Sequence, residues 1–348
     1  MKSLIDKLET KNNLTKDEWI TLFNNTSPDL NYYAAKKALK VKRKIYGDDI
    51  YIRGLIEFTN YCSNDCYYCG IRCHNKNAIR YRLSKKDILD CCKNGYDLGF
   101  RTFVMQGGED KYYTQEMLEE IVSSIKEKYS DCALTLSIGE RSFESYKGLK
   151  DAGADRFLLR HETADKEHYK KLHPYHQTFK NRINCLKDLK KLGYTVGSGF
   201  MVGAPFETAD TFAENMLFLN ELQPEMVGIG PFIPHKDTDF KNYKSGTLED
   251  TLFILSLIRL MMPEVLLPAT TALKTIHPDG HKLGILAGAN VIMPNLSPVK
   301  VRNKYSIYDN KACTGSEAAE YLFELKKEVE SIGSKIVVSK GDPVHRIN

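Results

Sequence analysis

Short apolar runs, often rich in β-branched residues, alternate along the chain with longer segments of helical period. The runs predict eight strands, at 52–59, 102–106, 133–138, 156–160, 195–202, 226–230, 265–270 and 290–294. The segments between them predict helices near 84–98, 113–129, 142–152, 164–191, 208–222, 247–261 and 277–287. Cap residues open four of these helices, at Ser84, Thr114, Thr208 and Thr247. This alternation predicts an α/β fold, a parallel (β/α)8 TIM barrel.

The barrel is predicted over 50–295 and is extended at both ends. Residues 1–45 have the pattern of helices that precede the first strand, and 296–348 form a C-terminal extension with a helix near 317–331. No low-complexity tract or long Gly/Ser/Pro linker divides the chain, so we expect a single domain over 1–348. An open doubly wound sheet or an incomplete barrel would give the same alternation and remains the alternative.

Polar or small residues recur where the predicted strands end. Six strand ends carry them: Thr59 with Asn60, Gln106 to Glu109, Ser137 to Glu140, Arg160 to Thr163, Thr270 with Thr271, and Pro294 with Asn295. In a TIM barrel the carboxyl ends of the strands face the active site. Polar ends on so many strands therefore indicate a shared site, whereas a single polar end would indicate only a loop.

Composition narrows the class of protein. The chain has 348 residues, 27% of them charged, with a net charge of +5 that is spread along its length and does not indicate a nucleic-acid partner. The N-terminus has no apolar signal-peptide core, and the longest apolar run, 251–262, carries Arg259. We therefore expect a cytoplasmic protein without a membrane partner, and the run 251–262 to be a buried helix.

Three of the nine cysteines follow the first predicted strand, within TNYCSNDCYYCGIRC. Cys62, Cys66 and Cys69 have the spacing C-x3-C-x2-C, and thiolates are ligands for zinc or for iron–sulfur clusters. Zinc would need a fourth ligand, which Cys73 could supply. Three thiolates can instead hold a 4Fe-4S cluster with one open iron, whereas electron-transfer clusters normally use four. An iron without a protein ligand would suit a catalytic cluster.

This motif, with Tyr68 directly before its last cysteine, resembles the radical S-adenosylmethionine (SAM) superfamily. More of the chain, about residues 30–312, resembles the HydE group of that superfamily, the maturases of FeFe-hydrogenases; RHET at 160–163 and VGIGPFIPH with PATTAL are the most specific segments. The resemblance implies that the open iron binds the methionine part of SAM. It also implies that one electron cleaves SAM to a 5′-deoxyadenosyl radical. Biotin synthase and methylornithine synthase are relatives that resemble the chain less.

The resemblance also implies residues that contact SAM. These are Tyr68, Gln106, Gly107, Gly108 and Glu109, together with Thr135, Ser137, Arg160, Glu162 and Arg182. From the residues alone, Thr135 and Ser137 share one face of their strand, and Arg160 and Glu162 share another. Each has an ordinary alternative: a tight turn at the glycines, a buried hydroxyl, an internal Arg–Glu ion pair, and a solvated arginine at Arg182.

The resemblance further implies a substrate cavity lined by Met226, Thr270, Thr271, Met293, Tyr305 and Tyr308. Methionine on a strand is otherwise ordinary core filling. The implied substrate is a small iron complex that carries cysteine, CO and cyanide, used to assemble the diiron subsite of the hydrogenase H-cluster. The implied partners are a reduced ferredoxin or flavodoxin-type electron donor and, transiently, other hydrogenase maturases.

Two other functions stay open. One is a radical SAM enzyme that acts on a small organic thiol or amino acid, and the other is a non-enzymatic zinc module. Some family members carry a second cluster on three C-terminal cysteines, but here Cys313 stands alone and Tyr321 and Glu324 occupy the other two positions. We therefore expect no second cluster.

Overall fold

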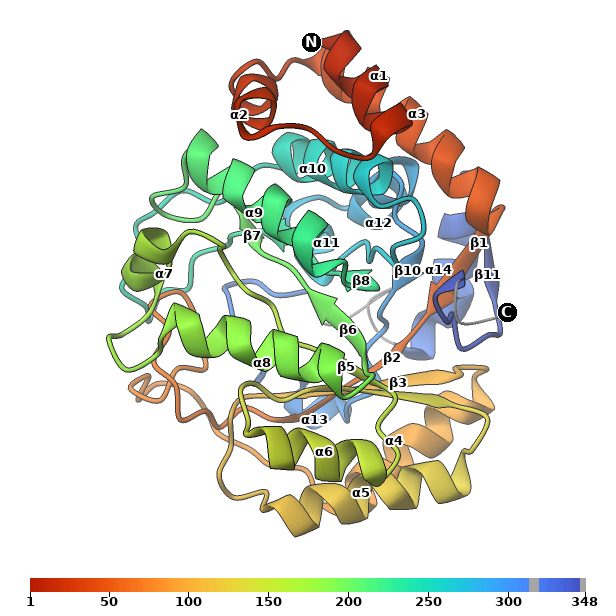
Figure 1. Ribbon diagram of the computed structural model, residues 1–348. Coiled ribbons are helices and arrows are strands. Elements are labelled where there is room, and N and C mark those ends of the chain that lie inside the picture. Colours follow the sequence, from red (N-terminus) through yellow and green to blue (C-terminus); the bar gives the residue numbers. More distant parts are fainter. Residues whose placement is uncertain (313–318, 345–348) are drawn as a thin grey trace.

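The computed structural model describes residues 1–312 and 319–344, and a ring of parallel strands lies at its centre (Figure 1). The first six members form one sheet: β2 (Gly54–Thr59), β3 (Thr102–Gly107), β4 (Ala133–Ser137), β5 (Arg156–Leu158), β6 (Thr195–Ser198) and β8 (Met226–Val227). Bridges from Met226 to Leu266 and from Pro268 to Val291 add the segment 265–268 and β10 (Val291–Ile292). A bridge from Asn295 to Leu55 returns to β2. The ring is closed, so the predicted TIM barrel is confirmed and an open sheet is excluded.

Helices cover the outside of the ring. Those that follow the first seven strands are α4 (Lys85–Asp97), α5 (Gln115–Lys128), α6 (Phe143–Asp151), α7 (Lys166–Leu172) with α8 (Phe179–Lys191), α9 (Ala209–Leu222), α10 (Leu248–Met261), and α11 (Thr271–Ile276) with α12 (Gly280–Leu286). The predicted caps at Ser84, Thr114, Thr208 and Thr247 are confirmed, because each side-chain oxygen accepts a hydrogen bond from the backbone N–H three residues later.

The N-terminal helices pack on one side of the barrel, at the top of Figure 1. They are α1 (Lys2–Lys11), α2 (Lys16–Asn24) and α3 (Pro28–Tyr46). They cover α9 and α10; Trp19 of α2 is fully buried and meets the ring of Phe212 edge-on at 6.1 Å. Because α10 lies between these helices and the barrel, residues 253–261 are all buried, as the apolar run predicts.

Within the described residues, no helix combines the length and the apolar character that a membrane span requires. Arg259 shows why the run 251–262 can be apolar yet internal. Its guanidinium donates to the carbonyls of Gly288 at 2.9 Å, Pro263 at 2.7 Å and Val265 at 2.8 Å. These bonds compensate the burial of its charge.

The amino end of the barrel is closed by the C-terminal segment. Strand β1 (Asp49–Ile52) pairs with β10 and with an added strand, β11 (Lys335–Val337), which the hydrophobic pattern did not predict. Beyond β11, Thr102 donates to the carbonyl of Lys340 at 2.7 Å. The remaining short elements are β7 (Met201–Val202), β9 (Gly230–Pro231), α13 (Val299–Arg302), α14 (Leu322–Glu330) and the 3₁₀ turn η2 (Ala319–Tyr321).

Several predicted elements are shorter than their patterns. The predicted helix 164–191 is wrong as one element, because Pro174 disfavours helical geometry at His173, whose backbone is extended, and α7 ends there. The predicted strand 195–202 divides at Gly199 into β6 and β7. A Cβ at Gly199 would lie 1.9 Å from the carbonyl oxygen of Gly228, so only glycine allows the chains to approach there. The predicted strand 265–270 contributes only isolated bridges, and the predicted helix 277–287 begins at Gly280.

Candidate functional site

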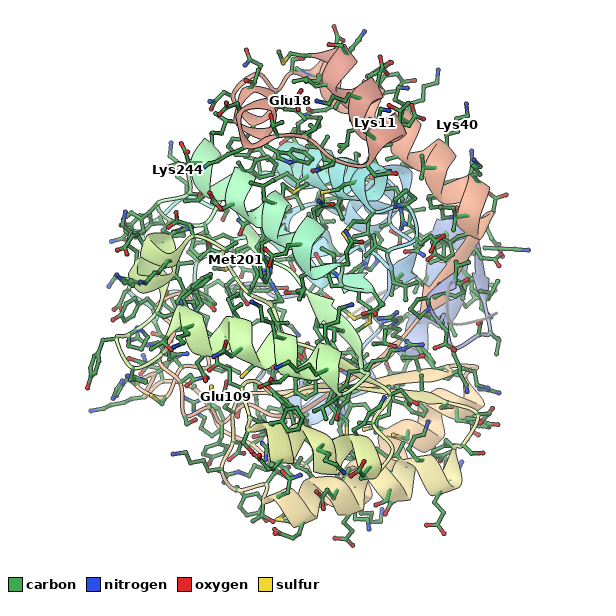
Figure 2. The ribbon with its side chains drawn as sticks, in the orientation of Figure 1. Lys11, Glu18, Lys40, Glu109, Met201 and Lys244 are labelled. Atoms are coloured by element: carbon green, nitrogen blue, oxygen red, sulfur yellow. The ribbon has the colours of Figure 1, made fainter. Side chains whose placement is uncertain are left out.

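A cavity of about 360 Å³ opens among the carboxyl ends of the strands. Glu109 and Met201, two of its lining residues, lie on the side of the molecule that carries α7 (Figure 2). The residues expected to hold the cluster, to contact SAM or to line the substrate cavity all line this cavity: Cys62, Cys66, Tyr68, Cys69, Gln106, Gly107, Gly108, Glu109, Thr135, Ser137, Arg160, Glu162, Arg182, Met226, Thr270, Thr271, Met293, Tyr305 and Tyr308. They come from elements that span 247 positions of sequence, and the barrel brings them to one place.

The three motif cysteines lie on the loop between β2 and α4. The Sγ of Cys62 accepts from the backbone N–H groups of Asn64 and Glu109, both at 3.4 Å. The Sγ of Cys66 accepts from the side-chain amide of Gln177 at 3.4 Å. Such donors stabilise a thiolate, but burial raises the pKa of the Cys62 thiol and raises that of Cys66 to about 12. These sulfurs therefore need a nearby positive charge to ionise, and bound metal supplies one.

The spacing of the sulfurs separates the two metal hypotheses. A single tetrahedral zinc ion holds its sulfurs about 3.8 Å apart, given Zn–S bonds of about 2.3 Å. Among residues 1–312 and 319–344, Cys62, Cys66 and Cys69 do not form a group whose sulfurs all lie within 4.8 Å of one another. The donor set therefore fits a larger iron–sulfur cluster better than one zinc ion.

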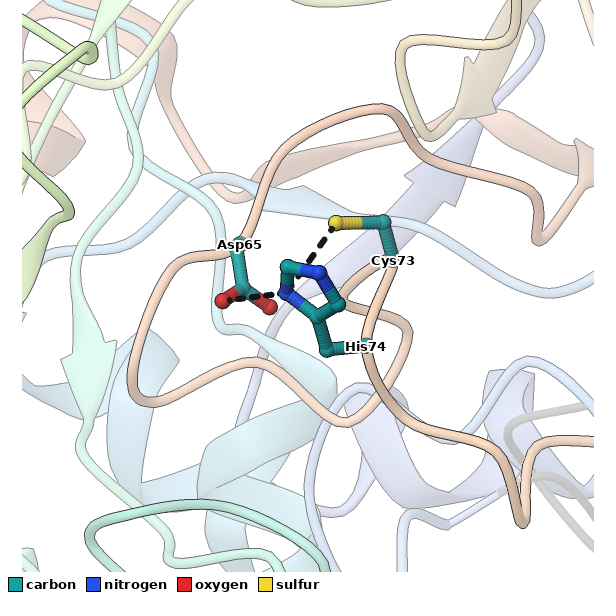
Figure 3. A group of neighbouring side chains, drawn as sticks. All are labelled: Asp65, Cys73 and His74. Carbon is teal, nitrogen blue, oxygen red and sulfur yellow. Dashed lines mark hydrogen bonds and ion pairs between the residues drawn. The ribbon is translucent and has the colours of Figure 1, made fainter.

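Cys73 points away from this site. It is exposed, does not line the cavity, and lies beside His74 and Asp65 (Figure 3). Arg72 donates to both oxygens of Asp65, at 2.6 and 2.8 Å, and holds the pKa of that carboxyl well below its usual range. Because both oxygens of Asp65 already accept from Arg72, we interpret Asp65, Cys73 and His74 as a cluster that stabilises the cysteine loop and not as a metal site.

A Gly-Gly-Glu strand end lies against the same loop. A Cβ on Gly108 would come within 2.2 Å of the carbonyl oxygen of Tyr61, so glycine is needed for this close approach. Glu109 is turned inward, where its Oε1 accepts from the backbone N–H of Glu140 at 2.8 Å. Burial raises the pKa of Glu109 because its negative charge is poorly solvated. A cationic group bound beside it would therefore stabilise the ionised carboxylate.

Arg160 and Glu162 face the cavity beyond β5. Their charged groups are 3.1 Å apart, yet Nε and Nη2 of Arg160 and Oε2 of Glu162 make no hydrogen bond within the described residues. Glu162 also has a positive φ of 64°, which is uncommon for a residue other than glycine. Charged atoms that lack hydrogen bonds, held at a cavity wall on a strained backbone, fit a polar ligand such as SAM.

The side chains of Arg182 and Tyr68 interact with polar groups of the protein. Arg182 donates to the Glu140 carboxylate at 2.5 Å and to the carbonyl of Arg160 at 2.7 Å. The hydroxyl of Tyr68 lies 3.1 Å from Nε2 of His173. Both residues reach the cavity, but these bonds also hold neighbouring segments in place.

The rest of the wall mixes hydroxyls with apolar groups. Oγ1 of Thr135 and Oγ1 of Thr270 are buried and have no hydrogen-bond partner among the described residues. Tyr305 is almost fully buried. The sulfur of Met226 accepts from Nη1 of Arg53 at 2.9 Å, so this methionine also positions a charged side chain.

Sequence reasoning missed several residues of the site, among them three that carry a charge. Glu57, Arg53 and Lys311 line the cavity, and Gln177 donates to Cys66. Glu57 and Arg53 gave a signal, because they are ionisable residues inside a predicted strand. Lys311 and Gln177 gave none, because they lie in loops distant in sequence from their partners. Of the three positions that carry the second cluster in other family members, Cys313 lies outside the described residues, Tyr321 lies in η2 and Glu324 in α14.

Comparison with known proteins identifies relatives. The family model for the Radical SAM superfamily matches residues 56–219. The chain is 41% identical over 334 residues to the [FeFe] hydrogenase maturase subunit HydE of Thermotoga maritima, covering 96% of this chain and 95% of that one. It is 31% identical over 263 residues to 3-methylornithine synthase of Methanosarcina acetivorans, covering 75% and 73%. The crystal structure of methylornithine synthase superimposes with a TM-score of 0.85 at 27% identity, covering 96% of this chain and 97% of that one.

Proposed function

This chain belongs to the radical SAM superfamily of enzymes, and from that premise we propose that it cleaves SAM reductively at a single 4Fe-4S cluster held by Cys62, Cys66 and Cys69. When bound, the cluster with its one open iron and SAM supply a one-electron cleavage that yields methionine and a 5′-deoxyadenosyl radical. The observation that carries this proposal is one cavity on which three thiols converge with charged atoms that make no hydrogen bond among the described residues.

In this proposal the protein binds and orients SAM. Glu109 accepts from the amino group, while Arg160 donates to the carboxylate and Glu162 accepts from the ribose hydroxyls, which are charge-assisted contacts. Tyr68, Gln106, Gly107 and Gly108 shape the strand end on which SAM rests, and Thr135, Ser137 and Arg182 contribute further polar contacts. The enclosed wall keeps water from the reacting carbon.

We further propose that the substrate is the small iron complex bearing cysteine, CO and cyanide that contributes to the H-cluster diiron subsite. The observation behind this choice is the 41% identity, over almost the whole chain, to a hydrogenase maturase. Met226, Thr270, Thr271, Met293, Tyr305 and Tyr308 would surround the substrate. A reduced ferredoxin or flavodoxin-type protein would deliver the electron, and other hydrogenase maturases would exchange the substrate or product.

An organic thiol or amino acid is the second candidate substrate. The likeness to methylornithine synthase, in sequence and in structure, favours it.

The first experiment tests the cluster. After anaerobic reconstitution we expect about four irons per chain, and dithionite with SAM should give 5′-deoxyadenosine and methionine in equal amounts. Cys66→Ser should abolish cleavage, and Cys73→Ser, in the same loop but exposed, should retain it. A colourless zinc protein, or full activity in Cys66→Ser, would refute the ligand assignment.

The second experiment separates the substrates. The synthetic iron–cysteine–CO–cyanide complex and a panel of amino acids are each added to the reduced enzyme with SAM. Consumption of the iron complex coupled to 5′-deoxyadenosine formation supports the maturase. Coupled turnover of an amino acid alone would replace it with the second candidate.

A further inference from the structure

A second ion pair lies in the cavity wall, on β2, where Glu57 is the strand partner of Gln106 but lies apart from Arg160 and Glu162 beyond β5. Glu57 on β2 is fully buried, and its Oε1 lies 2.7 Å from Nζ of Lys311. Its other oxygen accepts from the side-chain amide of Asn295 at 2.8 Å. The Lys311 side chain is only 7% exposed, and both charged residues line the cavity.

Burying two charges is costly unless they are well bonded. Removing them from water costs several kcal/mol per ion in general, so a buried pair is weak evidence for stabilisation. Lys311 reaches Glu57 from a loop 254 positions away and also lies 5.6 Å from the ring of Tyr305. Its ammonium has three N–H donors, and the Oε1 of Glu57 beside it makes no hydrogen bond among the described residues. The two side chains can therefore form further hydrogen bonds with a ligand in the cavity.

Glu57 and Lys311 lie on a different part of the cavity wall from Arg160 and Glu162. Glu57 lies on β2, whereas Arg160 and Glu162 follow β5, three strands further around the ring. The proposed function assigns Arg160 and Glu162 to SAM and leaves Glu57 and Lys311 without a role. One cavity thus presents two pairs of opposite charge on different walls.

We propose that Glu57 and Lys311 form the site for an α-amino-acid head group of the second substrate. The inference rests on the proposed function and deepens it. The substrate carboxylate accepts from Lys311, and its amino N–H groups donate to Glu57. An amine keeps N–H donors whether it is free or bound to metal, so the site serves an amino acid and an iron-bound cysteine alike. The adjacent carboxylate of Glu57 repels a bare anion, and Lys311 repels a bare cation, so both groups are needed.

The test compares three matched thioethers that cannot act as thiolate ligands. S-methyl-L-cysteine carries both charged groups, 3-(methylthio)propionate only the carboxylate, and 2-(methylthio)ethylamine only the amine. Binding is measured by anaerobic calorimetry on the reconstituted protein saturated with SAM. We expect S-methyl-L-cysteine to bind about tenfold or more tightly than either partial probe, because each lost charge removes a charge-assisted hydrogen bond.

Variants locate the site. Lys311→Met and Glu57→Gln should each weaken S-methyl-L-cysteine binding about tenfold and remove the preference over one partial probe. Lys311→Arg, which keeps the charge, should retain much of the binding. Lys300→Met is the matched control, since Lys300 lies in the same C-terminal region but is exposed and outside the cavity lining, and it should change nothing.

The outcomes separate this inference from the proposed function. SAM cleavage without substrate should stay within about twofold of wild type in the control Lys300→Met. If wild type cleaves SAM but shows no S-methyl-L-cysteine binding up to about 10 mM, or no preference for it, the head-group site is refuted alone. If Lys311→Met lowers thermal stability and leaves probe discrimination intact, the pair is merely structural. Failure of wild type to cleave SAM would refute the proposed function instead.

Discussion

Two arginines four residues apart, one at each end of β5, meet opposite surroundings. At the amino end Arg156 is fully buried, and its Nη2 donates to the carbonyls of Lys340 at 2.9 Å and Gly341 at 3.3 Å and to the Asp342 carboxylate at 2.6 Å. At the carboxyl end Arg160 faces the cavity, and two of its nitrogens make no hydrogen bond within the described residues.

The difference shows that the two ends of the barrel have different functions. At the amino end the Nη2 of Arg156 donates to three acceptors of the chain itself, so these bonds can only stabilise the fold. At the carboxyl end charged groups are buried with unused bonding capacity, which is costly without a ligand. This is the division expected of TIM barrels, where the carboxyl face binds ligand and the amino face stabilises the fold.

Acid should produce the largest effect, and it acts at the carboxyl end. Burial, with Arg160 and Arg182 nearby, lowers the pKa of His161 to about 3, and burial also lowers that of His173 to about 3. Their unfolded pKa is about 6.5, so below that pH only the unfolded chain takes up these protons. The free energy of unfolding should therefore fall by roughly 3 kcal/mol per pH unit between about pH 6 and 4.

Urea denaturation across this range measures the slope. His173→Gln should reduce the slope by about half, because one proton-binding site is removed. His176→Gln, at an exposed histidine of the same loop, is the control and should leave it unchanged. An unchanged slope in His173→Gln would contradict the assignment.

Arg156→Met should produce the next largest effect. It strips the donor from two carbonyls and from Asp342, so we expect a loss of about 3 kcal/mol in the free energy of unfolding. SAM affinity should not change, because Arg156 does not line the cavity. Arg43→Met, which breaks an exposed pair with Asp48, should cost less than about 1 kcal/mol. Weaker SAM binding at unchanged stability would break the comparison between the two ends.

Glu162→Gln should have the smallest effect on the fold and act on the ligand. The amide keeps the shape but removes the charge, so SAM should bind about tenfold more weakly. Thermal stability should change by less than about 1 kcal/mol, since Glu162 Oε2 makes no hydrogen bond within the described residues and loses only its ion pair with Arg160. Equilibrium dialysis of SAM and a melting curve give the two readings, with exposed Glu167→Gln as control. Reduced stability at full SAM affinity would assign Glu162 to the fold.

Much of the fold was predictable because the pattern that carries it is local. The strand and helix periods and the cap at Ser84 depend on neighbours a few residues away, and they led to the confirmed barrel. The errors came from tertiary context. β11 is a strand because β1 offers it a partner, and the segment 265–268 forms only isolated bridges, to Met226 and to Val291.

The candidate site divides in the same way. Cys62, Cys66 and Cys69 lie within eight positions, so the sequence by itself determined the motif, its spacing and the family it resembles. Only the tertiary structure decided that Gln177 donates to Cys66, that Arg156 donates to the C-terminal segment while Arg160 faces the cavity, and that Lys311 meets Glu57. The physical reason is that bonding capacity and burial depend on contacts between residues far apart in the chain, which the closed barrel alone brings together.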